Sequence, residues 1–147
     1  MTLSLPQSAF WEGSVDPFVT ADQLVLHAVG DYLLQSHWMA TAKTSRKTAA
    51  LAHALVYSGP FLLLAPSWAA LFFIFGTHFV IDHWRLARYV CWSKNFLAPP
   101  SEWPAPWSKC STTGYDPNLP AWLAIWLMII ADNVMHVLCN AAALRWL

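Results

Sequence analysis

Four segments of this sequence can form helices long enough to cross the hydrocarbon core of a bilayer, which takes about 20 residues. They lie near residues 22–41, 47–66, 67–92 and 119–146. The third and fourth begin with strongly apolar runs, whereas the first is amphipathic and would be missed by hydropathy alone. This arrangement predicts an all-α fold: an integral membrane four-helix bundle, formed by one domain over residues 1–147.

Composition favours the same prediction. Residues of the set AVILMFWYC make up 57% of the 147 residues and only 11% are charged, whereas about a quarter of a soluble domain is charged. Eight Lys and Arg balance eight Asp and Glu, so the chain lacks the basic surface that nucleic-acid binding requires. We therefore expect the lipid bilayer as partner and no nucleic acid, while homo-oligomerisation stays open.

Basic residues are unevenly distributed along the chain. All but one lie in the first connection, or at and beyond the end of the third expected helix: Lys43, Arg46, Lys47, Arg85, Arg88, Lys94 and Lys109. The positive-inside rule then predicts a multi-pass protein of the inner cell membrane with both termini outside the cytoplasm. We expect residues 1–21 to form an interfacial lead-in and residues 93–118 to form a long loop rich in Pro and Trp.

Histidine and aspartate residues spaced four apart recur in three of the expected helices. The pairs are His27 with Asp31, His78 with Asp82, and Asp132 with His136, and a single His53 lies on the remaining helix. Residues four apart share one face of a helix. At a rise of about 1.5 Å per residue, all seven side chains are expected at one depth, within roughly 7 Å of the bilayer midplane.

These seven residues are the candidate metal ligands. An ionisable side chain near the bilayer centre costs at least about 2.5–3.5 kcal/mol on insertion scales, so we expect the seven to face one another. Imidazole and carboxylate ligands together suit Zn, Mn or Fe, and the bundle could hold one or two such ions. A structural network of interhelical hydrogen bonds and a proton or ion relay are the alternatives.

Two residues of the second expected helix are candidates for proton transfer in catalysis: His53, alone on its helix, and Tyr57, one turn later. Gln35 and Asn140 continue the faces of the first and last pairs by one turn, and either could orient a ligand. The sequence contains no H-E-x-x-H, G-x-S-x-G or Gly-rich phosphate-loop motif. Zincin proteases, serine hydrolases and nucleotide-binding motors are therefore unsupported.

The function favoured by these observations is a membrane-embedded metal-binding protein, and more specifically a metal-dependent hydrolase of a lipid or lipid-linked substrate. A bound metal would activate water and polarise the scissile bond. The alternative is a non-enzymatic membrane protein, either handling ions or protons or serving as a phage-derived envelope factor, whose cluster is structural. An open coordination position beside a lipid-accessible cleft would favour the enzyme, since structural sites are closed.

The order of the motifs resembles a family of small bacterial and phage multi-pass membrane proteins classed as a domain of unknown function. The shared pattern is H-x-x-x-D-x-x-x-Q-x-x-W from His27, a single histidine at His53, H-x-x-x-D from His78 and D-x-x-x-H from Asp132. That family usually has Phe at position 32 and Gln at position 133, neither of them a proposed ligand. The resemblance implies a helical membrane protein with an inward His/Asp cluster and brings no established activity.

Overall fold

The computed structural model describes residues 17–147, and this part of the chain is helical without any strand, which confirms the all-α prediction. Most of the expected lead-in, residues 1–16, lies outside the described residues. The longer elements, with the π-helical turn η1 and the 3-10 turn η2, are α1 (Ala21–Ala28), η1 (Val29–Leu33), α2 (His37–Ala42), α3 (Lys47–Ser58), η2 (Gly59–Leu64), α4 (Trp68–Trp84), α5 (Ala87–Lys94) and α7 (Ala121–Trp146).

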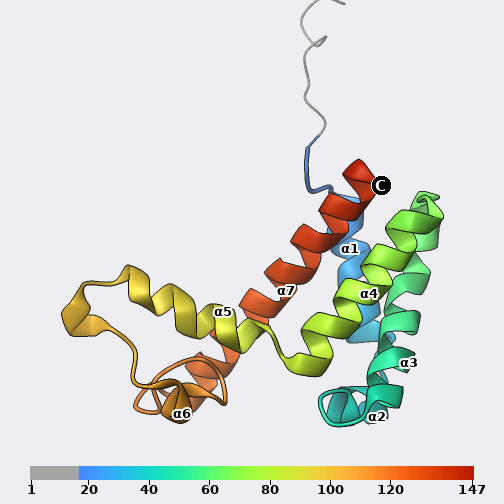
Figure 1. Cartoon of the computed structure of the whole chain (residues 1–147). Coiled ribbons are helices and arrows are strands. Elements are labelled where there is room, and N and C mark those ends of the chain that lie inside the picture. The colour runs from blue at the N-terminus through green and yellow to red at the C-terminus, as the bar shows by residue number, and fades with distance from the viewer. Residues whose placement is uncertain (1–16) are drawn as a thin grey trace, which may run out of the picture.

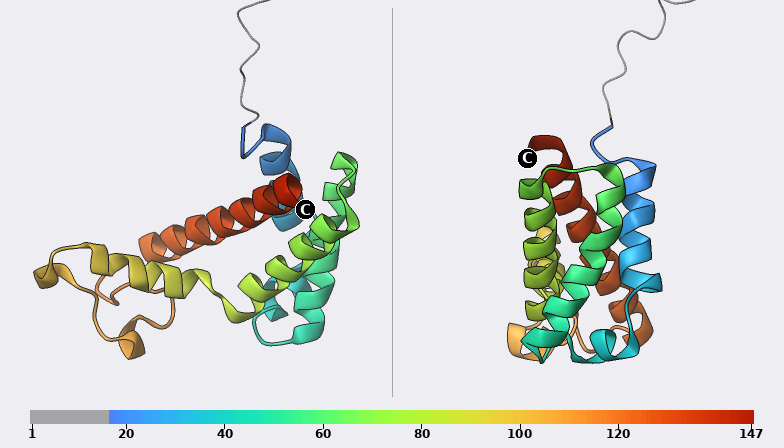
Figure 2. Two further views of the ribbon diagram at one scale, coloured as in Figure 1. Left: turned by 45° about the horizontal axis from the view of Figure 1, so that its top comes forward. Right: turned by 90° about the vertical axis from the view of Figure 1, so that its right-hand side faces the viewer.

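Four helical segments lie side by side: α1 with η1, α3 with η2, α4 and α7 (Figure 2, right). α4 contacts both α3 and α7, while α1 contacts α7 and η1 contacts α3, so each segment has two neighbours. The start of α1 and the C-terminus lie at one end of this bundle, and α2 lies at the opposite end (Figure 1). The bundle therefore surrounds a shared interior, and six of the seven histidine and aspartate residues singled out in the sequence meet there.

Two of the four expected helices are interrupted. The segment expected over 22–41 consists of α1, the π turn and α2, with Ser36 in extended conformation capping α2 through its hydroxyl. The segment expected over 67–92 ends as α4 at Trp84, because Arg85 adopts a left-handed conformation with φ of 51°. A residue other than glycine rarely adopts this conformation, so the break has no signal in the sequence.

Of the helices in the described part, one, α7, is long and apolar enough to cross a membrane. α4 has 17 residues, at the lower limit for a span, and α3 passes into a 3-10 turn at Gly59, next to Pro60. One helix of this kind does not by itself establish a membrane location. The expectation of four continuous spans is thus not met by the helix lengths.

Residues 95–120 form an arm outside the bundle, which α5 connects to α4 (Figure 1). The expected loop over 93–118 contains three short helices: η3 (Asn95–Leu97), η4 (Pro100–Glu102) and α6 (Trp107–Cys110). α5 packs against α7. The indole nitrogen of Trp92 donates a hydrogen bond to the carbonyl oxygen of Ala105 at 3.1 Å, which helps to hold the arm together.

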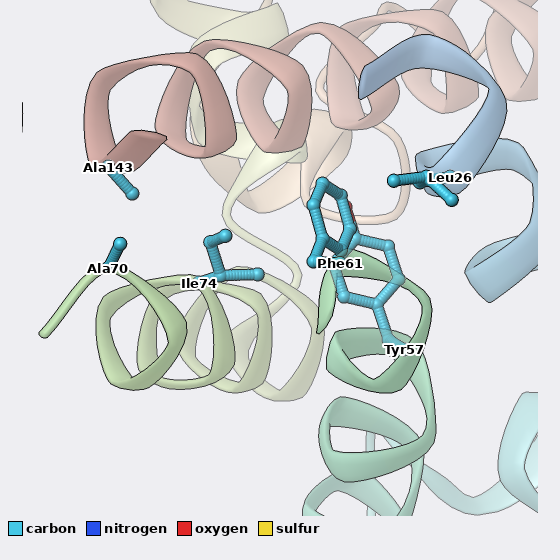
Figure 3. Packing of buried hydrophobic residues seen from close by; sticks show 6 residues of the cluster. All are labelled: Leu26, Tyr57, Phe61, Ala70, Ile74 and Ala143. Carbon is cyan, nitrogen blue, oxygen red and sulfur yellow. The ribbon is translucent and has the colours of Figure 1, made fainter. Parts of the chain in front are cut away.

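The apolar core is small and lies toward the end of the bundle that carries the C-terminus. Its side chains, drawn in Figure 3, come from α1, α3, η2, α4 and α7: Leu26, Tyr57, Phe61, Ala70, Ile74 and Ala143. Large apolar residues are instead exposed on the outside, among them Leu63 at 82%, Phe72 at 71% and Trp122 at 66%. The bundle therefore buries a group of polar side chains beside its apolar core and exposes many large apolar ones, a distribution that is unusual for a soluble domain.

Candidate metal centre

Four helical segments bring six of the seven predicted ligands together in the bundle interior. Asp31 comes from the π turn and His53 from α3, while α4 and α7 each supply one predicted pair: His78 with Asp82, and Asp132 with His136. These six residues form three overlapping groups whose ligand atoms lie within 4.8 Å of one another. π turns inside helices are frequent at functional sites, and here the turn carries a cluster carboxylate.

The tightest group joins the Nε2 atoms of His53 and His78 to Oδ2 of Asp82. The two nitrogens lie 2.9 Å apart, and each is 3.1 Å from the carboxylate oxygen. With bonds of about 2.0–2.2 Å to nitrogen and oxygen, ligand atoms that share a metal lie about 3–3.5 Å apart. The three atoms therefore already have the spacing of one face of a coordination polyhedron.

A second group contains Asp31, His78 and His136. Oδ1 of Asp31 and Nε2 of His136 are buried and have no hydrogen bond of acceptable geometry among the described residues. Oδ1 of Asp31 lies 3.5 Å from Nε2 of His78 and 3.2 Å from Nε2 of His53. Unpaired buried polar atoms are rare in folded proteins and call for an explanation such as an ion. A metal contacting both atoms would satisfy them, so the residues present fit a metal.

Asp82 belongs to two groups through different oxygens. Its Oδ2 faces His53 and His78, whereas its Oδ1 lies 3.7 Å from Nε2 of His136, which is in turn 3.4 Å from Oδ2 of Asp132. A carboxylate placed in this way can hold one ion through each oxygen. The geometry is thus compatible with the one or two ions expected from the sequence.

The charge balance of the cluster depends on its three carboxylates, on Lys43 and on the protonation of its histidines. Lys43 donates a hydrogen bond from Nζ to Oδ2 of Asp82 at 2.8 Å, and this pair lies largely out of solvent. With neutral imidazoles, three carboxylates and one ammonium group leave two negative charges uncompensated. Buried charges require partners, and either one divalent cation or the protonation of two cluster imidazoles would supply the missing charge.

His27, the seventh predicted ligand, lies outside all three groups. Its Nδ1 is 2.9 Å from the hydroxyl oxygen of Tyr57, and its Nε2 is 2.9 Å from Oδ1 of Asn133. Nδ1 also lies 3.5 Å from Oδ2 of Asp31. With both ring nitrogens in hydrogen bonds, His27 supports the cluster rather than offering a free ligand atom.

The two residues predicted for proton transfer have different surroundings. Nε2 of His53 lies among the ligand atoms, which favours its other predicted role as a ligand. Tyr57 is fully buried, its ring stacks on His78 with centroids 3.6 Å apart, and its hydroxyl accepts a hydrogen bond from Nδ2 of Asn140 at 2.6 Å. Gln35 places its Nε2 2.9 Å from Nε2 of His53. Gln35 therefore contacts a cluster ligand directly, whereas Asn140 reaches the cluster only through Tyr57.

Two cavities border the carboxylate side of the cluster. One of about 330 Å³ reaches Asp82 and Asp132, and one of about 200 Å³ reaches Asp31 and Asp132. Lys43 lines both of them. The side chain of Asp132 is 28% exposed, whereas the histidines of the cluster are almost completely buried. The cluster is therefore closed on its imidazole side, and its access lies at Asp132, which lines both cavities.

Sequence reasoning missed two contributors, Lys43 and Asn133. In the sequence, Lys43 serves only as one of the basic residues that predict membrane orientation. No local pattern links it to Asp82, 39 residues away. Asn133 follows the ligand candidate Asp132 directly, and helical geometry places adjacent residues on different faces. Its contact with His27 depends on how α1 and α7 pack, which the sequence pattern does not encode.

Comparison with known proteins gives one result. A family described as "Protein of unknown function (DUF3307)" matches residues 19–103, more than half of the chain. The matched span contains the first three motifs of the expected pattern, while Asp132 and His136 lie beyond it. No curated protein and no solved structure gives a significant match. The chain therefore belongs to the DUF3307 family.

Proposed function

We propose that this protein is a membrane-embedded metal-binding protein of the inner cell membrane, and that it acts as a metal-dependent hydrolase of a lipid or lipid-linked substrate. The observation that carries the proposal is the group formed by His53, His78 and Asp82. Its three ligand atoms lie 2.9–3.1 Å apart in a buried interior contributed by several helices. Nitrogen and oxygen ligands together favour Zn, Mn or Fe.

Membrane embedding is supported by the distribution of polarity over the bundle. A soluble protein rarely exposes contiguous large apolar surface, yet exposed Leu, Phe and Trp side chains cover the outside of α3, η2, α4 and α7. Polar residues gather inside, where they have one another as partners. α1, η1 and η2 are short, but packing against neighbouring segments satisfies irregular backbone at membrane depth.

The hydrolase proposal is supported by the access to the cluster. Catalytic metal sites keep an open position, whereas structural sites are closed by four protein ligands. Cavities reach Asp82 and Asp132, and a bound metal would supply activated water and polarise a scissile bond there. A purely structural network is the competing explanation, in which Oδ1 of Asp31 would pair with a protonated His53 at 3.2 Å instead of with a metal.

Elemental analysis of detergent-purified protein tests metal binding. We expect about one to two equivalents of a transition metal in wild type and clearly less in Asp82→Ala, because removing a charged ligand weakens a site strongly. Asp22→Ala is the matched control, since Asp22 is exposed on the first turn of α1 and should retain the metal. Full occupancy in Asp82→Ala, or no metal in wild type after adding Zn or Mn, would contradict the proposal.

Incubation of metal-replete protein with a total membrane lipid extract tests the enzyme. We expect release of head groups or acyl chains, detected by mass spectrometry, and loss of this release in Asp82→Ala. If the protein binds the metal but releases nothing from the lipids, the proposed metal binding stands and the proposed hydrolysis of these lipids is wrong.

A further inference from the structure

The cavity of about 330 Å³ beside the cluster has walls of unusual composition for a bundle interior. Its lining residues come from α2 and the residues after it, from the junction of α4 with α5, and from α7. Cations from two separate elements, Lys43 and Arg85, line it together with the cluster carboxylates Asp82 and Asp132. Part of the remaining lining is apolar: Ala40, Met128 and Ile129. One cavity therefore combines two positive charges, the edge of the candidate metal centre and an apolar wall.

Lys43 and a metal at the cluster would compete for the same oxygen. Its ammonium group lies 2.8 Å from Oδ2 of Asp82, the atom that also faces His53 and His78 at 3.1 Å. A cation bound between these ligands repels the ammonium group. The flexible four-carbon chain of lysine then allows Nζ to turn into the cavity, where its three donors become available to an anion.

Arg85 is held at the cavity by its backbone. It is the residue with left-handed φ that ends α4, a conformation that is unfavourable for side chains with a Cβ and often occurs at functional sites. Its guanidinium donates one hydrogen bond to the carbonyl oxygen of Thr112 at 2.9 Å. Further donors of the planar guanidinium group suit a tetrahedral oxyanion.

We infer that this cavity binds the phosphoryl group of a phosphoester, with Lys43 and Arg85 as its anion contacts beside the metal centre. The inference rests on the proposed function and specifies its substrate class. A neutral ester or amide would need no second cation, whereas a phosphate dianion matches two. The apolar wall accommodates the alcohol part. Hydrolysis joins a water oxygen to phosphorus and breaks the P–O bond to the alcohol, while one water proton ends on the alcohol and the other on the phosphate.

Calorimetric titration of metal-loaded, detergent-solubilised protein with inorganic phosphate tests the inference, with metal content measured on the same samples. Wild type should bind phosphate, and Lys43→Met and Arg85→Met should each bind it at least about tenfold more weakly, as for a lost hydrogen bond to a charged group. Both variants should retain the metal. Lys43→Arg keeps a cation at this position and should bind phosphate much more tightly than Lys43→Met. Lys47→Met removes an exposed charge at the start of α3 and should bind phosphate as wild type does.

Two organic probes identify the source of the phosphoryl group. Tighter binding of dioctanoyl phosphatidic acid than of glycerol 3-phosphate assigns a lipid, and equal binding assigns a soluble phosphoester. Binding of dioctanoylglycerol as tight as that of the phosphatidic acid would overturn the inference, because the phosphate would then contribute nothing. Metal-loaded wild type that binds no phosphate, or unchanged binding in both Met variants, would also overturn it while leaving the metal centre intact. Absence of metal would defeat the proposed function and the inference together.

Discussion

Replacing Tyr57 with phenylalanine removes one hydroxyl from the centre of the bundle and leaves the ring in place. That hydroxyl lies 2.9 Å from Nδ1 of His27 and accepts a hydrogen bond from Nδ2 of Asn140 at 2.6 Å, and all three residues are buried. The ring stack on His78 is retained, so apolar packing hardly changes. Each partner left unsatisfied costs about 1–3 kcal/mol. We therefore expect Tyr57→Phe to lower the free energy of unfolding by about 2–4 kcal/mol.

Thermal unfolding in detergent, followed by tryptophan fluorescence, measures this loss. For a chain of this length the expected loss is a decrease in Tm of about 5–15 °C. The matched control is Tyr32→Phe, because the hydroxyl of Tyr32 contacts Asn133 at an exposed position and its loss should cost no more than about 1 kcal/mol.

The same two variants test the role of Tyr57 in catalysis. Metal content should be unchanged in Tyr57→Phe, since Tyr57 is not among the grouped ligands. Equal Tm values for the two variants would refute the buried hydrogen-bond network. Loss of lipid turnover with Tm and metal content intact would instead make Tyr57 the proton-transfer residue that the sequence suggested.

Three further perturbations have expected outcomes. Gly30→Ala should lower Tm by several degrees, because a Cβ at position 30 would lie 2.6 Å from Cδ2 of Tyr57. The control is Gly76→Ala, whose added Cβ meets nothing within 4 Å and should leave Tm equal or higher. Removing the metal with a chelator should lower the Tm of metal-loaded protein by about 5–10 °C, since a ligand at 100 times its Kd stabilises by about 2.7 kcal/mol. Adding Zn should restore the Tm. An unchanged Tm after chelation would indicate that the site holds no metal. Cysteines introduced at Thr44, just after α2, and at the C-terminal Leu147, on a background without the native cysteines, should react from opposite sides of the membrane, because α2 and the C-terminus lie at opposite ends of the bundle (Figure 1). Labelling from one side would contradict the topology.

The sequence was sufficient to identify the helical class and most of the candidate ligands. Helical geometry alone places His78 next to Asp82 and Asp132 next to His136, and the structure has these contacts at 3.1 and 3.4 Å. Because charge is scarce elsewhere in the apolar segments, the same residues are conspicuous in the sequence by itself. We predicted their mutual approach from the unfavourable energy of ionisable groups in an apolar environment, and the structure brings six of the seven together.

The lengths of the helices could not be obtained in this way. The apolar pattern continues through Leu34 and Arg85, although the helices end there. No proline or glycine in the sequence signals these ends, and Arg85 ends α4 by adopting a left-handed conformation. The break at Arg85 directs α5 out of the bundle and leaves α4 at 17 residues. Local sequence pattern therefore overestimated how far each segment continues as one helix.

Contacts between segments were decided only by the tertiary structure. His27 and Asp31 look equivalent as ligand candidates in the sequence, yet His27 is turned to Tyr57 and Asn133, while Asp31 joins the ligand groups from a π turn. Lys43 reaches Asp82 because α2 folds back beneath the bundle. Spacing along one helix is fixed by the backbone hydrogen bonds of that helix, and a sequence can therefore reveal it. Which atoms meet between helices depends on side-chain rotamers and on the packing of all four segments at once.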